Sequence, residues 1–328
     1  MIRFALFGAG RAGRIHAGNI ARHPRAELAA VYDVVRPLAE RLAEQHGSCA
    51  VPDPGAVWTA DAIDAVLIAS STDTHVDLLR AALRSGKATY CEKPIDFDLS
   101  RARSVVSEAA GTDVPVAVGF RRRCLPEYQE IRRRIADGEI GRVETVRLVS
   151  RDHRPPSRAY VDVSGGFLRD KTIHYFDLIP WLVGERPTEV HAAGSCLVDP
   201  MFADAGDIDT AMVLLRMPSG ALCHIENGRR AVYGFDERIE VFGAKGMLQS
   251  RPPALSSVAR FAASGVRSGR YPDLYGAESF AGLLDAFVSA LESEQPVEPT
   301  LAEGLQAQNI AEAAVESLRG NRPVTIAY

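Results

Sequence analysis

Lysine is rare in this chain, and one lysine stands where an amine could do chemistry. The sequence contains four lysines among its 38 basic residues, and one of them, Lys93, follows the apolar run 88–91 in the tripeptide Glu92-Lys93-Pro94. A desolvated ammonium group can share or lose its proton, whereas a guanidinium cannot. We therefore interpret Lys93 as a candidate catalytic residue. A surface lysine beside a turn proline is the alternative interpretation.

A second candidate is the pair Asp170 and His174, four residues apart in a helix predicted over 170–183. At this spacing the carboxylate lies about one turn from the imidazole and can orient or polarise it. A neutral histidine is a natural base for a hydroxyl proton. A pair on the helix surface is the alternative. Gly165 and Gly166 upstream and Pro180 within the helix indicate an unusual backbone path.

A glycine-rich turn predicts a dinucleotide site. Gly8, Gly10 and Gly13 separate a strand predicted at 2–7 from a helix predicted at 14–22. Glycines let the backbone approach a pyrophosphate, and a helix N-terminus offers free N–H groups to it. Asp33 ends the next strand, 28–33, about 20 residues beyond the last glycine, where a carboxylate binds an adenosine ribose. That carboxylate favours NAD, while the nearby Arg36 leaves NADP open.

Alternating strands and helices predict a parallel sheet in the first 120 residues. Gly8, Asp33, Ser70 and Lys93 all follow strand ends, so we expect them at one edge of this sheet. The predicted strands are 2–7, 28–33, 65–70, 88–91 and 114–118, and the other predicted helices are 37–46, 74–85 and 100–110.

After residue 120 the pattern changes to an antiparallel or mixed sheet with helices. Predicted strands are 142–151, 188–195, 208–217, 221–229 and 238–242, and predicted helices are 127–137, 170–183, 277–294 and 301–319. Residues 251–273 are expected to form a loop. The predicted fold is α/β, with a Rossmann domain at 1–120 and an α+β domain at 121–328 whose C-terminal helix packs back on the first domain.

Composition agrees with an enzyme of two domains. The chain has 328 residues, 46% of them hydrophobic, and a net charge of −4, which gives no reason to expect nucleic acid or a membrane as partner. Its five cysteines lack the spacing of metal ligands, so we expect no metal site. No run approaches membrane-spanning length, and we expect a cytoplasmic protein with reduced thiols.

Several stretches together resemble the Gfo/Idh/MocA oxidoreductases over essentially the whole chain. They are the glycine turn with Asp33, residues 70–75, Cys91 to Pro94, residues 119–123 and the Asp170/His174 pair. Within that family the chain resembles most the bacterial inositol 2-dehydrogenases, through residues 150–152, 164–166, 172–174 and 227–236.

The resemblance implies a polyol dehydrogenase with NAD as cofactor and an open C-terminal sheet that forms a homodimer or homotetramer. It implies that His174 takes a hydroxyl proton, Lys93 stabilises the alkoxide, and Asp170 binds a neighbouring hydroxyl and tunes His174. Arg121, His153 and Tyr233 match positions that face the substrate. The implied cofactor-binding residues are Gly8, Gly10, Arg11, Ala12, Gly13, Asp33, Arg36, Ser70, Ser71, Thr72, His75, Glu92, Lys93 and Arg121.

Three positions depart from the inositol 2-dehydrogenase pattern and are expected along the substrate wall. His153 follows Asp152 where a proline is usual, Lys171 replaces a common methionine, and Phe235 replaces a frequent tyrosine. The leading hypothesis is oxidation of myo-inositol to its 2-keto form, scyllo-inosose. The alternatives are a dehydrogenase of another inositol isomer or sugar derivative, a glycosidase of the same fold that uses NAD transiently, and a dinucleotide-binding sensor.

Overall fold

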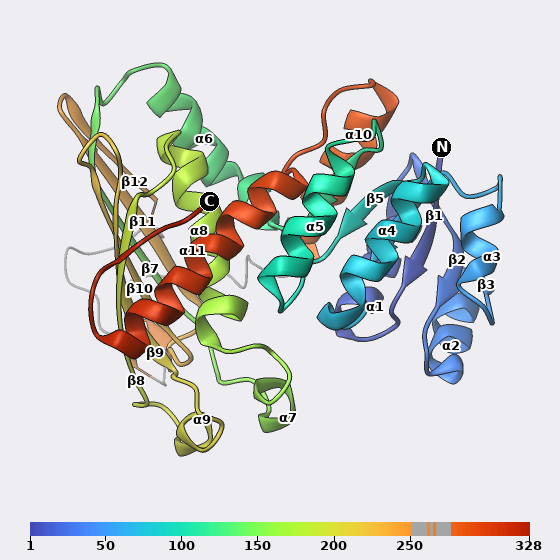
Figure 1. The fold of residues 1–328 in the computed structure, drawn as a ribbon, viewed down its shortest axis with the longest axis horizontal. Helices are drawn as coiled ribbons and strands as arrows, with labels where there is room; N and C mark the ends of the chain where they lie inside the picture. The colour runs from blue at the N-terminus through green and yellow to red at the C-terminus, as the bar shows by residue number, and fades with distance from the viewer. Residues whose placement is uncertain (251–260, 263–264, 267–276) are drawn as a thin grey trace. The chain divides into compact units, whose positions relative to one another are not determined.

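The computed structural model describes residues 1–250, 261–262, 265–266 and 277–328, and the chain divides into two compact units (Figure 1). The first comprises Met1–Cys124 and Gly276–Leu305, and the second comprises Leu125–Tyr275 and Gln306–Tyr328. Helix α11 (Leu301–Gly320) begins in the first unit and ends in the second. The boundary at residue 120 drawn from sequence stays a prediction.

The first unit is built on a parallel sheet, as predicted, and its six strands lie in the order β3-β2-β1-β4-β5-β6. The strands are β1 (Ile2–Phe7), β2 (Ala26–Tyr32), β3 (Cys49–Ala50), β4 (Ala65–Ile68), β5 (Ala88–Cys91) and β6 (Val116–Val118). The helices are α1 (Arg11–Arg22), α2 (Arg36–His46), α3 (Gly55–Thr59), α4 (His75–Ser85), α5 (Leu99–Ala109) and α10 (Ala277–Glu292). Sequence patterns did not predict the short elements β3 and α3.

The strands of this sheet are buried on both faces, which explains their nearly continuous apolar sequence. Phe4 of β1 and Tyr90 of β5 are fully buried and contact Phe287 of α10, with ring centroids 6.2 and 6.1 Å apart. Arg25 binds Asp285 and Glu292 of the same helix at 2.7 Å each. Helix α10 therefore belongs to the core of the first unit, although it follows the strands β7 to β12 of the second unit in the sequence.

The second unit is built on a mixed, mostly antiparallel sheet of seven strands in the order β12-β11-β7-β10-β9-β8-β15, in which only β7 and β10 pair in parallel. The strands are β7 (Val143–Arg151), β8 (Glu189–Ser195), β9 (Thr210–Arg216), β10 (Leu222–Gly228), β11 (Asp236–Gly243), β12 (Gly246–Ser250) and β15 (Val324–Thr325). This architecture confirms the predicted α/β fold class.

The helices of the second unit gather on one face of its sheet (Figure 1). They include α6 (Pro126–Ala136), α8 (Ile173–Val183) and the end of α11, whose Ser317 hydroxyl accepts the N–H of Ala192 in β8 at 3.0 Å. Short helices α7 (Arg158–Val161) and α9 (Pro200–Asp204) lie in connections for which sequence patterns predicted no element. Among the described residues no helix has the length and apolar content needed to cross a membrane.

Two predictions for the second half need correction. The helix predicted at 170–183 begins as a π-helical turn, η3 (Leu168–Thr172), before it continues as α8. In the predicted loop at 251–273, Phe261–Ala262 (β13) and Gly265–Val266 (β14) pair as short antiparallel strands. The rest of that prediction lies outside the described residues.

The glycines of the first turn have different packing roles. Gly8 has a φ of +98°, and a Cβ there would lie 2.6 Å from the backbone of Ala69 and Ser70. A Cβ on Gly13 would lie 1.8 Å from the carbonyl oxygen of Gly8, so the first turn of α1 packs directly on the strand-to-helix turn. At Gly10, no atom lies within 4 Å of such a Cβ.

Gly13→Ala should therefore destabilise the first unit by about 2 kcal/mol, because the backbone must move to admit the methyl group. Gly10→Ala is the matched control, since its φ of −71° suits alanine and the position is open. Thermal unfolding should show a lower midpoint for Gly13→Ala alone. Equal midpoints for the two variants would contradict this packing.

Candidate active site

The N-terminus of α1 has the properties of an anion site. Gly10 caps the helix without a side-chain hydrogen bond, so the first N–H groups of α1 receive no side-chain cap. Space above Gly10 is open, and the residue is exposed. Free N–H groups and the positive end of a helix dipole bind phosphate groups. Arg11 is exposed and Ala12 half-buried in the first turn of this helix.

Asp33 is fixed next to this turn by backbone donors. Its carboxylate accepts the N–H of Ala9 at 2.6 Å and the N–H of Val35 at 2.7 Å, one on each oxygen. Each carboxylate oxygen can accept a further hydrogen bond, and the side chain is half-buried rather than enclosed. The residues of this edge therefore fit an adenosine ribose at Asp33 and a pyrophosphate at the glycine turn.

Among the described residues, the contact found for Arg36 holds it along its own helix and not toward this edge. Its Nε donates to Glu40 Oε1 at 2.7 Å, one helical turn along α2, and both side chains are exposed. Arg36 is therefore an exposed charge in the first turn of α2, paired within its own helix.

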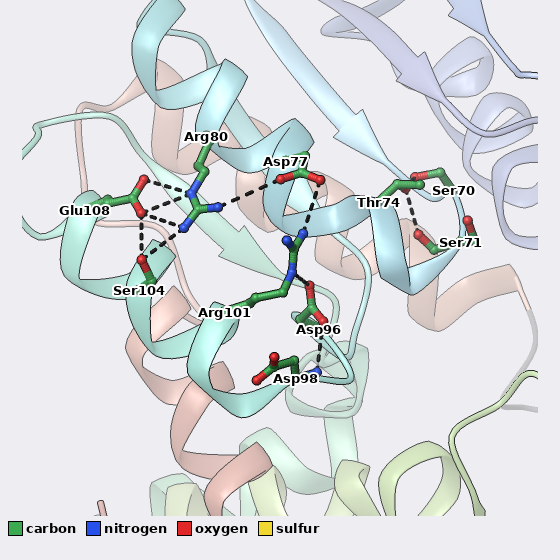
Figure 2. A network of polar contacts seen from close by, with 10 residues as sticks. All are labelled: Ser70, Ser71, Thr74, Asp77, Arg80, Asp96, Asp98, Arg101, Ser104 and Glu108. Carbon is green, nitrogen blue, oxygen red and sulfur yellow. Dashed lines mark hydrogen bonds and ion pairs between the residues drawn. The ribbon is translucent and has the colours of Figure 1, made fainter.

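The residues after β4 are tied to the turn that contains Lys93. Ser70 Oγ lies 2.7 Å from Thr74 Oγ1, next to the short helix η1 (Thr72–Thr74), as Figure 2 shows. The ring of His75 is buried and contacts Pro94 O at 2.8 Å and Ser70 O at 3.2 Å. Burial lowers the pKa of His75 and favours the neutral ring. Ser71 is exposed and Thr72 half-buried.

A surface ion network anchors the chain just beyond Lys93 (Figure 2). Arg101 of α5 donates to the buried Asp96 at 2.9 Å and to Asp77 of α4 at 3.1 Å. The N–H of Asp98 also donates to Asp96, at 2.9 Å. These contacts fix the segment after Pro94 to the two helices that cover this side of the sheet.

Glu92 brings His16 into the site, a residue to which the sequence analysis assigned no role. His16 Nε2 lies 2.8 Å from Glu92 Oε1, and the other oxygen of Glu92 accepts the N–H of Lys93 at 3.3 Å. Burial opposes the charge on Glu92, but His16 and nearby cations outweigh it and lower its pKa. A Cβ on Gly119 would lie 2.8 Å from Glu92 Oε2, so glycine there leaves room for this carboxylate. The position of His16 one turn after Gly13 was the only signal in the sequence.

Lys93 itself is half-buried and follows the end of β5. Gly8 and Ser70 follow β1 and β4, which belong to the same sheet. Arg121, also predicted to bind cofactor and substrate, packs on α10. Its guanidinium lies 4.4 Å from the ring centroid of Phe280 and is hydrogen-bonded to Ser279. Four of the predicted cofactor residues, Gly8, Asp33, Ser70 and Lys93, thus follow the ends of β1, β2, β4 and β5.

In the second unit, Asp170 lies in η3 and His174 in the first turn of α8. Gly165 and Gly166 precede them with φ values of +80° and +98°, and the N–H of Phe167 donates to both oxygens of Asp207 at 3.0 Å. The wider π turn changes the angle between Asp170 and His174 from that of an ordinary helix. Such turns are frequent at functional sites.

Asp170 is buried and accepts two hydrogen bonds, one from a phenol and one from a guanidinium. Tyr160 Oη donates to Oδ1 at 2.7 Å, and Arg229 Nη2 donates to Oδ2 at 2.8 Å. Burial opposes the charge on Arg229, but Asp170 and Asp152 outweigh it and raise its pKa. Sequence reasoning missed Tyr160 and Arg229 as site residues. Arg229 stands in a stretch that carried the family resemblance, whereas no pattern marked Tyr160.

The other predicted substrate residues differ in setting. Tyr233 Oη donates to Asp236 at 2.7 Å and accepts a bond from Arg151 at 3.0 Å. Burial, followed by Asp236, raises the pKa of Tyr233. His153 is exposed.

Comparison with known proteins identifies the family. Residues 2–120 match the oxidoreductase family with an NAD-binding Rossmann fold, and residues 128–249 match the Gfo/Idh/MocA C-terminal domain. The chain is 40% identical to the inositol 2-dehydrogenase of Rhizobium meliloti over 329 residues, which cover 99% of each protein. The chain belongs to the Gfo/Idh/MocA oxidoreductase family.

Solved structures of inositol dehydrogenases have the same fold. A myo-inositol dehydrogenase from Corynebacterium glutamicum is 36% identical with a TM-score of 0.90, over 100% of this chain and 99% of that one. A scyllo-inositol dehydrogenase from Lactobacillus casei, solved with NAD(H) and scyllo-inositol, is 28% identical with a TM-score of 0.86 over all of both chains.

Replacing Asp33 tests its role in cofactor choice. Asp33→Asn should reduce the preference for NAD over NADP about tenfold or more, because the carboxylate that repels a 2′-phosphate and binds the ribose is lost. Arg36→Ala is the control and should leave the preference unchanged, since Arg36 pairs with Glu40. Titrations of both cofactors by fluorescence measure the ratio. An unchanged ratio in Asp33→Asn would mean that the ribose is recognised elsewhere.

Proposed function

We propose that this chain catalyses the NAD-dependent oxidation of a cyclic polyol hydroxyl to a ketone, with myo-inositol going to scyllo-inosose as the leading reaction. The observation that carries the proposal is Asp170, a buried carboxylate between Arg229 and Tyr160 four residues before a histidine. The fit of the glycine turn and Asp33 to a dinucleotide supports it. So do the names of relatives, which include a myo-inositol 2-dehydrogenase and a scyllo-inositol dehydrogenase.

In this proposal each polar group has a defined role in the reaction. His174 accepts the proton of the reacting hydroxyl, and Lys93 stabilises the negative charge that develops on its oxygen. Asp170 accepts a hydrogen bond from a neighbouring hydroxyl and keeps His174 oriented. Bound at the glycine turn and Asp33, NAD would supply the hydride acceptor for this oxidation. Arg121, His153 and Tyr233 are proposed to contact other parts of the substrate.

Arg229 gives a physical reason for Asp170 to stay ionised. An ionised carboxylate can only accept hydrogen bonds, which suits a polyol hydroxyl as donor. The raised pKa of Arg229 reflects the same attraction from the cation's side. A neutral Asp170 would compete with the polyol as a donor, so its charge is central to substrate binding.

A panel assay tests the proposed function. The chain should form NADH steadily with NAD and myo-inositol, scyllo-inositol or a related polyol. Lys93→Ala should lower kcat about 10²- to 10³-fold through the lost stabilisation of the alkoxide, with NAD affinity nearly intact. Lys87→Ala is the matched control, because Lys87 lies just before the start of β5, whereas Lys93 follows its end. Lys87 Nζ donates to Ala60 O and Ile63 O at 2.9 Å.

The same panel separates the alternatives. Sugar release from a glycoside without net NADH would favour the glycosidase, and cofactor binding without any turnover would favour the sensor. A Lys93→Ala variant with the wild-type rate would remove Lys93 from the mechanism.

We further propose that the protein forms a homodimer or homotetramer through the second sheet. Helices cover one face of this sheet, and the described helices leave the other uncovered (Figure 1). Leu222, Phe242 and Met247 lie in one row across that face and are 36%, 45% and 49% exposed. Leu214 and Met212 extend the patch along β9. Exposed apolar patches of this kind mark protein interfaces.

The five free cysteines support a cytoplasmic location.

Phe242→Asp should reduce the assembly to monomers, because a charge would be buried without a partner at the interface. The control is Val163→Asp, which changes a 68% exposed apolar residue outside the sheet. Light scattering after gel filtration gives the mass. An unchanged mass for Phe242→Asp, or a monomeric wild type, would contradict the proposed interface.

A further inference from the structure

Four charged side chains of the second unit form a row of alternating sign. Lys171 Nζ lies 2.7 Å from Asp152 Oδ1, and Asp152 Oδ2 lies 3.3 Å from Arg229 Nη1. The other terminal nitrogen of Arg229 lies 2.8 Å from Asp170 Oδ2. The charges thus run from cation to anion twice, and Arg229 bridges the two carboxylates.

Lys171 is held in this row by a site made for an ammonium group. Its side chain is only 4% exposed. Besides Asp152, the ammonium donates to Ser150 Oγ at 3.3 Å and lies 5.9 Å from the ring centroid of Phe235. A buried ammonium is costly unless it is paired and hydrogen-bonded. Its partners come from the end of β7 and the segment before β11, so distant parts of the chain converge on it.

The row makes the two carboxylates share one guanidinium. Asp152 has two cationic partners, whereas Asp170 has Arg229 together with the hydroxyl of Tyr160. The contact from Arg229 to Asp152 is the longest of the three ion pairs. If the charge of Lys171 were lost, Asp152 would attract Arg229 more strongly and shorten that contact. Arg229 would then move away from Asp170.

We propose, on the basis of the proposed function, that Lys171 is a positioning residue for polyol binding. By satisfying Asp152, it keeps Arg229 on Asp170 and so fixes the direction in which Asp170 accepts a substrate hydroxyl. Lys171 needs no contact with substrate or cofactor for this role. Its replacement should affect polyol binding and leave the dinucleotide edge of the first unit unaffected.

Kinetics of Lys171→Met test this role, since methionine fills similar space without the charge. The KM for myo-inositol should rise about tenfold or more, as expected when one charge-assisted hydrogen bond is misdirected. The KM for NAD should stay unchanged, a split that general loss of structure would not produce. Lys171→Arg restores the cation and should recover most of the loss. An unchanged KM for myo-inositol in Lys171→Met would overturn the inference.

A double variant tests the route through Asp152. In an Asp152→Asn background there is no second carboxylate to draw Arg229 away, so adding Lys171→Met should raise the KM for myo-inositol little further. Equal effects of Lys171→Met in both backgrounds would show that Lys171 acts independently of Asp152 and would contradict the inference.

A crystal structure of Lys171→Met tests the positioning without relying on turnover. The Arg229 Nη2 to Asp170 Oδ2 contact, 2.8 Å in the native chain, should lengthen beyond hydrogen-bonding distance as Arg229 moves onto Asp152. An intact contact would overturn the inference even if the wild type oxidises inositol. A wild type that oxidises no polyol would instead overturn the proposed function, and this structure would still decide whether Lys171 positions Arg229.

Discussion

A buried or half-buried carboxylate needs hydrogen-bond donors around it, and three such carboxylates determine how this chain presents its polar groups. Asp33 accepts the backbone N–H of Ala9 in the glycine turn and that of Val35 after β2. Glu92 is bonded to His16 and to the backbone of Lys93. Asp170 is bonded to Arg229 and Tyr160. In each case the donors fix the carboxylate before any ligand arrives, which lowers the cost of ordering the site on binding.

The donors differ in kind, and the difference suits the proposed tasks. Backbone donors at Asp33 are rigid and keep the ribose-binding group at a set distance from the helix N-terminus. At Asp170 one donor is a guanidinium, which brings a positive charge that must itself be balanced. The balance extends through Asp152 to Lys171. The site around Asp170 can therefore be changed by a substitution at Lys171. The site around Asp33 depends instead on Gly8 and Gly13, where backbone atoms leave no room for a side chain.

The first unit could be predicted closely from the sequence because its signals are local. Strands β1 and β5 were predicted to the residue, since each is an apolar run ended by a glycine or a charged residue. The π turn could not be predicted, because helical periodicity does not distinguish a single wide turn from an ordinary one. His16, Tyr160 and Arg229 join partners 76, 10 and 59 residues away, and such pairings leave no trace in spacing. The departures Lys171 and Phe235 were expected along the substrate wall, which remains a prediction. In the structure Lys171 contacts both Asp152 and the ring of Phe235.

We propose that Lys93, Asp170 and His174 act together on one hydroxyl-bearing carbon. A crystal structure of the chain with NAD and myo-inositol tests this most directly. The account predicts Lys93 Nζ and a ring nitrogen of His174 within hydrogen-bonding distance of the same hydroxyl, with Asp170 bound to its neighbour. An inositol held by other residues, or none of these three groups in contact with it, would contradict the account.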